Sequence, residues 1–145
     1  MTDSLSPMHL FWPVATAILL AACATTPVPS SSAHPVPPER ILAPEFTKPQ
    51  QGFAMLVVTR DRGFLMSACE ATVFVDGFKV AKLLQAEQIR LFVEEGDHLV
   101  GVSAETGICL GGSDQESFKV TRAKPLLLRI AAGNGLGIQI EPSAF

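Results

Sequence analysis

The chain has 145 residues, with 11 lysines and arginines against 14 aspartates and glutamates, and a formal net charge of −3. A nearly neutral chain without a clustered basic face lacks the electrostatic footprint of nucleic-acid binding, so we expect no nucleic-acid partner. It also lacks a polybasic segment that would bind anionic lipids. Composition divides the chain into three regions, residues 1–22, 23–50 and 51–145.

The first region contains an apolar run of 13 residues, from Leu10 to Ala22. As a helix this run would span roughly 20 Å, which is less than the ~30 Å hydrocarbon core of a bilayer, and it contains Pro13. The run is therefore more typical of a signal peptide than of a transmembrane helix. The residues before it include no lysine or arginine. This leaves open a start at Met8, or a cytoplasmic protein with an apolar tail.

The apolar run ends in Leu20-Ala21-Ala22-Cys23, which resembles the lipobox of bacterial lipoproteins. That resemblance implies cleavage before Cys23 and lipidation of its thiol. Two or three acyl chains would hold the protein firmly on a membrane, at roughly 0.8 kcal/mol per buried methylene. The next residue is Ala24, whereas aspartate at this position retains enteric lipoproteins in the inner membrane. We therefore expect a lipid anchor in the outer membrane, facing the periplasm.

The second region, residues 23–50, is rich in proline and serine. It contains seven of the 11 prolines and none of the 11 glycines. Such a composition favours a semi-stiff polyproline II tether with too little apolar surface to pack into a core. Within it, Ile41, Leu42 and Phe46 are the residues we expect to dock against the domain that follows.

Residues 51–145 alternate short β-type runs with turn signals, and no helix is convincing. Asp76-Gly77 is a hairpin signal, and Gly96-Asp97 is a second turn signal. The pattern predicts an all-β fold, a single antiparallel immunoglobulin-like β-sandwich of seven or eight strands. We expect a glycine-rich loop from residue 107 to about residue 114. The expected strands are 54–60, 69–75, 78–83, 88–94, 98–104, 118–121, 126–130 and 136–140.

Two cysteines, Cys69 and Cys109, belong to the third region. An even pair in an exported domain suggests a disulfide. Across the 40-residue separation such a bond would contribute about 4 kcal/mol in the chain-entropy model. Two buried free thiols are the alternative.

Four motifs follow one another in the third region: TRD-x-G…SAC from Thr59 to Cys69, V-x-V-DG from Val73 to Gly77, G-x-H at residues 96–98 and G-x-C at residues 107–109. In this order they resemble small proteobacterial lipoproteins and periplasmic proteins, with a layout like DUF2846-type and PEGA-like β-domains. The resemblance implies a β-sandwich lipoprotein, and it implies little about biochemical function.

Arg60, Asp61 and Arg62 form the most distinctive polar cluster, and we treat them as a candidate binding loop. Two arginines and an aspartate on a loop could grip a carboxylate, a phosphate or an acidic partner side chain. The alternative is a solvated turn with local ion pairs of little energetic weight.

Catalytic and metal-binding patterns are weak. His98 is the only histidine of the third region, and a metal site usually needs at least three converging ligands, so no metal or cofactor is predicted. Three acidic residues beside a predicted turn could supply oxygen ligands to a weakly bound calcium ion. Acidic side chains at such a place are more typical of a solvent-exposed sheet edge. No serine lies in a nucleophile elbow. The acids are Glu94, Glu95 and Asp97, and the serines are Ser67, Ser103, Ser113 and Ser117.

Together these features predict a lipid-anchored periplasmic module that binds or stabilises another component of the envelope and performs no catalysis. Its partners would be the membrane, through Cys23, and an envelope protein. An envelope hydrolase with an unrecognised active site and a purely structural lipoprotein are the alternatives.

Overall fold

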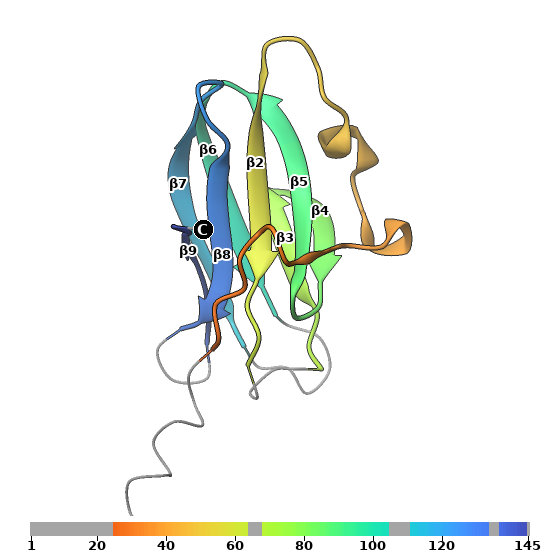
Figure 1. Cartoon of the computed structure of the whole chain (residues 1–145), viewed down its shortest axis with the longest axis vertical. Helices are drawn as coiled ribbons and strands as arrows, with labels where there is room; N and C mark the ends of the chain where they lie inside the picture. Colours follow the sequence, from red (N-terminus) through yellow and green to blue (C-terminus); the bar gives the residue numbers. More distant parts are fainter. Residues whose placement is uncertain (1–24, 64–67, 105–110, 134–136, 145) are drawn as a thin grey trace, which may run out of the picture.

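The computed structural model of the chain describes residues 25–63, 68–104, 111–133 and 137–144. The predicted signal peptide (residues 1–22) and the lipidation site Cys23 lie outside the described residues, as does Cys109. The described part folds into two β-sheets packed face to face (Figure 1). Among these residues, no helix has the length and apolarity that crossing a membrane requires.

The first sheet has five strands in the order β1-β5-β2-β8-β9, and the second has four in the order β4-β3-β6-β7. Two short 3₁₀ helices, η1 (Pro38–Arg40) and η2 (Pro44–Thr47), precede β2. The strands are β1 (His34–Pro35), β2 (Phe53–Arg60), β3 (Ala71–Val75), β4 (Phe78–Leu83), β5 (Glu87–Glu94), β6 (Gly96–Ser103), β7 (Ser113–Val120), β8 (Leu126–Ala132) and β9 (Ile138–Pro142).

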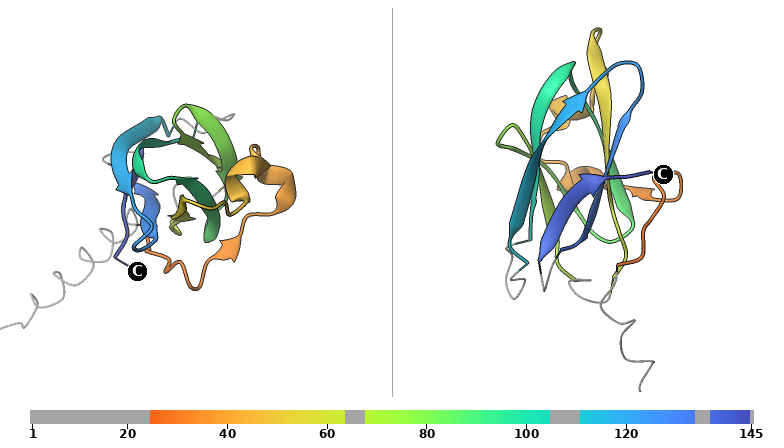
Figure 2. Two further views of the ribbon diagram at one scale, coloured as in Figure 1. Left: turned by 90° about the horizontal axis from the view of Figure 1, so that it is seen from above. Right: turned by 90° about the vertical axis from the view of Figure 1, so that its left-hand side faces the viewer.

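Strand β2 lies at the centre of the first sheet. It pairs antiparallel with β5, where Phe53 faces Glu94, and parallel with β8, where Leu56 faces Leu126. In the second sheet every pairing is antiparallel. The views of Figure 2 show the two layers edge-on, with the N-terminal segment wrapped around one side.

Alternation of apolar and polar residues places the core between the layers. Ala71, Val73 and Val75 of β3 are fully buried, and Leu91 of β5 is buried with them. Because side chains of a strand alternate between its two faces, these spacings direct one face of each strand inward. The prediction of an all-β sandwich is confirmed, although the β1–β5 and β2–β8 pairings are parallel where antiparallel pairing was expected.

The hairpin turn predicted at Asp76-Gly77 connects β3 and β4. Asp76 and Gly77 have φ angles of 50° and 84°, the left-handed values that a two-residue hairpin turn requires. The second predicted turn lies about one residue earlier than expected: β5 ends at Glu94 and β6 begins at Gly96, so Gly96 and Asp97 already pair with Val120 and Lys119.

Two other details of the prediction are corrected. The described residues form nine strands in place of seven or eight, because His34–Pro35 adds β1 beside β5. Ser113 and Asp114, predicted in a glycine-rich loop, begin strand β7 opposite Ser103 and Val102.

The prediction that residues 23–50 form a tether that does not pack into a core is the larger correction. Residues 25–50, which we call the strap, lie along the sandwich and contribute Val36 and Ala43 to its core. The amide of Val36 donates to the Gln88 carbonyl (2.9 Å), and the amide of Leu42 donates to the Val80 carbonyl (2.9 Å). The proline-rich composition did not prevent packing. A few buried apolar side chains, together with the backbone amides of the residues between the prolines, are enough to attach the strap to the sandwich.

The three residues predicted to dock behave differently from one another. Ile41 and Phe46 are partly buried against the core, as expected. Leu42 remains 43% exposed. The strap is therefore part of the domain, which does not begin at residue 51.

Candidate functional site

Arg60 of the candidate binding loop is a buried structural residue. Its side chain is held at the end of β2, where its guanidinium donates to the carbonyl oxygens of Cys69 and of Leu83, the second at 2.6 Å. Burial lowers the pKa of Arg60 to about 10, with the negative charge of Glu87 acting in the opposite direction. Nη1 is engaged by two backbone carbonyls and the residue is only 5% exposed, so Arg60 is not presented to an external anion.

Asp61 is buried as well and ties the strap to the sandwich. Its Oδ1 accepts from the amide of Val28 (3.1 Å), and its Oδ2 lies 2.6 Å from Nη2 of Arg129. Burial raises the pKa of Asp61, while the amide of Val28 and the charge of Arg129 act in the opposite direction. These contacts come from the strap and β8, elements that are distant in sequence.

Only Arg62 of the three is exposed, and its backbone pairs with Thr26. The structure therefore contradicts both expectations for this stretch. Arg60 and Asp61 form neither a binding loop with Arg62 nor a solvated turn, because two of the three side chains are taken up by internal contacts.

Cys69 is buried and disulfide-bonded. Its partner is outside the described residues, as are both other cysteines of the chain, Cys23 and Cys109. The pairing of Cys69 with Cys109 stays a prediction.

His98 has partners at both ring nitrogens. Nδ1 lies 2.7 Å from Oδ2 of Asp76, and Nε2 lies 2.8 Å from the carbonyl oxygen of Glu94. Although the histidine–aspartate contact is one element of a catalytic triad, Nε2 is occupied by a backbone carbonyl and has no free position for a serine hydroxyl. Across the described ranges, no group of three or more histidine, cysteine or acidic side chains could hold a metal ion.

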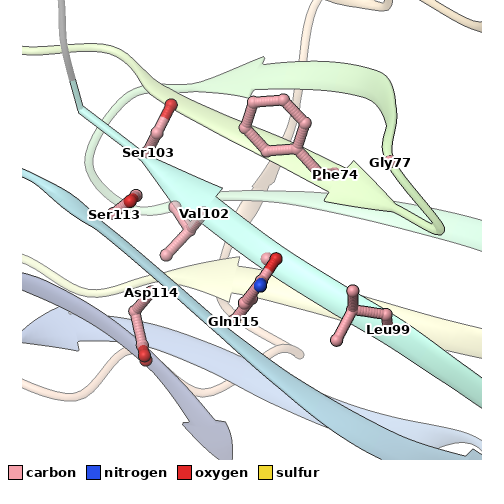
Figure 3. Close-up of a pocket in the computed structure, with 9 residues that line it drawn as sticks. Phe74, Gly77, Leu99, Val102, Ser103, Ser113, Asp114 and Gln115 are labelled. Atoms are coloured by element: carbon pink, nitrogen blue, oxygen red, sulfur yellow. The ribbon is translucent and has the colours of Figure 1, made fainter.

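A hollow with a volume of about 560 Å³ lies on the outer face of the four-stranded sheet (Figure 3). Strands β3, β6 and β7 form its floor, and the β3–β4 turn closes one end. Phe74 and Leu99 provide apolar walls, and three polar side chains complete the lining: Ser103, Ser113 and Gln115.

A glycine of β6, Gly101, forms part of the floor of the hollow. Gly101 faces both Phe74 of β3 and Gln115 of β7. A Cβ atom at Gly101 would lie 3.1 Å from the Cβ of Gln115 and 3.3 Å from the Asp114 carbonyl, closer than side chains normally approach. A larger residue would thus fill the floor or push β7 away.

The surface that the hollow offers is uncharged. Among the described residues that line it, Asp114 alone is charged, and its Oδ2 accepts from the amide of Ile140 (2.9 Å) on β9. In Figure 3 the Asp114 and Val102 side chains point toward the other face of the sheet. An aromatic ring, an aliphatic side chain, two hydroxyls and one amide remain available. Such a mixture suits an uncharged ligand with both polar and apolar groups.

Sequence reasoning did not find this hollow. Gly101 lies in a predicted strand, but a glycine there has no distinctive neighbours in sequence. Ser113 and Gln115 fell in or beside a predicted loop, so their position opposite β6 was not foreseen. The one available signal was the uninterrupted polar run of residues 113–117.

Comparison of the chain with protein-family models, curated proteins and solved structures found no match.

Proposed function

We propose that this protein is a lipid-anchored module of the bacterial envelope that binds another envelope component through the uncharged hollow on its β4-β3-β6-β7 sheet. The observation that carries this proposal is the hollow itself, where Phe74, Leu99 and Gln115 are left free on a sheet face. The lipobox-like sequence ending in Cys23 supports the anchor, and the periplasmic location follows from it. A binding role is favoured over hydrolysis because His98 has both ring nitrogens engaged.

Site-specific photo-cross-linking in intact cells tests the proposal. The probe replaces Leu99, which is 41% exposed at the wall of the hollow, and in a second strain Gln115. The matched control places the same probe at Ala123, an exposed residue of the β7–β8 connection. Each is repeated with Cys23→Ala, which removes the predicted lipid acceptor.

We expect one discrete product from both hollow positions, absent from the Ala123 control and lost with Cys23→Ala. Identical products from all three positions would show contact by random collision and contradict the hollow as a site. A hollow-specific product that survives Cys23→Ala would retain the binding role and contradict the need for the anchor.

A further inference from the structure

A second cavity, of about 320 Å³, lies at the end of the sandwich where β2 begins and β5 ends. In Figure 1 this is the upper end, and the described chain starts near the lower end. It is separate from the hollow on the sheet face and does not depend on the proposed function. Three aromatic side chains line it: Phe46 of η2, Phe53 of β2 and Phe92 of β5.

The aromatic surface continues beyond the cavity. The rings of Phe46 and Phe78 have centroids 6.2 Å apart and are tilted by 42°. Phe78 is 64% exposed, the highest value among the three exposed large apolar side chains of the described residues. Phe78 therefore extends the apolar surface of the cavity out to the tip of the β3–β4 hairpin.

The charge of the cavity is negative. Its titratable side chains are Glu45, Asp76, Glu94 and His98. Asp76 is paired with His98. Within the described ranges, the carboxylates of Glu45 and Glu94 form no ion pair. Two unpaired carboxylates therefore stand beside three phenylalanine side chains.

Aromatic faces and carboxylates together attract cations, the first through the ring quadrupole and the second through charge and hydrogen bonding. A quaternary ammonium has no N–H to offer a carboxylate. A guanidinium is planar, stacks on aromatic rings and donates two parallel hydrogen bonds to a carboxylate. The same acids oppose docking on an anionic lipid surface.

From this combination of ring surface and unpaired carboxylates, we infer that the cavity receives the guanidinium group of an arginine on a protein partner. Glu45 and Glu94 bind its N–H groups, and Phe46, Phe53 and Phe92 contact its flat face and aliphatic stem. Phe78 extends the contact to the partner's surface around that arginine.

Nuclear magnetic resonance titration tests the inference on the full-length, ¹⁵N-labelled chain in an uncharged maltoside detergent. The probe is Nα-acetyl-arginine methylamide, and the control is the citrulline analogue, which has the same shape without the charge. Sodium chloride keeps the ionic strength equal in both titrations, because screening alone changes exposed charge interactions. The lysine analogue is titrated in parallel.

We expect saturable shifts of the amides around Phe53, Glu94 and His98 with the arginine derivative and none with citrulline. Glu94→Gln should weaken the affinity about threefold, the loss expected for one exposed ionic contact. Phe53→Leu should weaken it by a similar factor of about three through loss of the ring. The matched control Glu116→Gln, an exposed carboxylate of β7, should leave the affinity unchanged.

Three outcomes would overturn the inference. Equal shifts with citrulline would show that charge is not recognised. Shifts confined to amides away from the cavity, or no shifts at all, would remove the site. Tighter binding of the lysine analogue would contradict the guanidinium as the occupant. None of these outcomes bears on the hollow of the other sheet.

Discussion

His98 joins three parts of the backbone through a single side chain. It contacts Asp76 in the β3–β4 turn and the carbonyl of Glu94 at the end of β5, while Asp76 also accepts from the amide of Leu99 (2.9 Å). Both groups facing the ring accept hydrogen bonds, so the doubly protonated ring can donate to both of them at once. Burial lowers the pKa of His98, but these hydrogen bonds outweigh it and raise that pKa. Burial raises the pKa of Asp76, and the hydrogen bonds from His98 and Leu99 outweigh it and lower that pKa.

The pH dependence of stability follows from these directions. The raised pKa of His98 stabilises the fold below the unfolded value of about 6.5, and this is lost as the pH rises through the folded pKa. The lowered pKa of Asp76 stabilises the fold above the unfolded value of about 3.9, and this is lost as the pH falls through the folded pKa. The pair is therefore strongest between about pH 4 and pH 6.5.

We predict that His98→Gln lowers the free energy of unfolding at about pH 5 by roughly 0.2–1 kcal/mol, the range of a solvent-screened ion pair. It should have less effect at about pH 8, so the variant's stability changes less with pH than that of the unmodified protein. Urea denaturation at both pH values measures this. His34→Gln, at an exposed histidine of β1, is the matched control. An unaltered pH dependence in His98→Gln would contradict the role given to this histidine.

Other residues show where sequence reasoning reached its limit. From the local sequence alone, Arg60 and Asp61 would be expected to lie in solvent. Their partners, among them Val28, Leu83 and Arg129, belong to separate parts of the chain and meet only in the folded domain. Local pattern carries no information on such contacts, so the burial of this charged pair could not be predicted.

Among the elements, those with alternating apolar residues were predictable, and those without were not. Strands β3 and β5 bury alternate side chains, and the period of two reveals both the strand and its inward face. The start of β7 has no apolar residue until Phe118, so it was taken for a loop. The parallel pairing of β2 with β8 depends on the order of strands in space, which periodicity does not contain.

A partly buried ion pair helps to hold the strap on the sandwich. Arg40 of η1 donates from both terminal nitrogens to the carboxylate of Glu87, with Nη1 lying 2.7 Å from Oε2. The same carboxylate accepts from the amide of Leu84 (2.7 Å). Burial raises the pKa of Glu87, but these hydrogen bonds outweigh it and lower that pKa. The pair thereby fixes η1 to the β4–β5 connection.

We predict that Glu87→Gln loosens the strap and leaves the sandwich folded. Losing the charged acceptor should lower the free energy of local opening by about 1–2 kcal/mol, or about tenfold in exchange rate. Hydrogen exchange at the amides of Val36 and Leu42, which bond to β5 and β4, measures this. Glu39→Gln, the exposed neighbour of Arg40, is the control. Unchanged exchange at both amides would show that the strap is held without this ion pair.

At the scale of the whole molecule, the surfaces available for binding differ in chemistry and place. The outer face of one sheet has an uncharged hollow, and the end of the sandwich where β2 begins has an aromatic cavity with unpaired acids. The start of the described chain is tied to the opposite end, where Thr26 pairs with Arg62. A lipid anchor at Cys23 would thus leave the aromatic cavity on the side away from the membrane. This arrangement requires that the Cys23 thiol is free for acylation. The identity of the cysteine that pairs with Cys69 therefore decides whether the anchor can form.

We predict that Cys69 pairs with Cys109. In that case Cys109→Ser exposes the Cys69 thiol to alkylation under denaturing, non-reducing conditions. It should also lower the free energy of unfolding by about 4 kcal/mol, because a 40-residue separation is no longer closed. Cys23→Ser should do neither, and it should remove the acyl chains detected on the N-terminal peptide by mass spectrometry. If Cys23→Ser were instead the variant that freed Cys69, the cysteine of the lipobox-like motif would be a disulfide partner. Because a thiol in a disulfide cannot accept lipid, that result would contradict the anchor and the envelope function proposed from it.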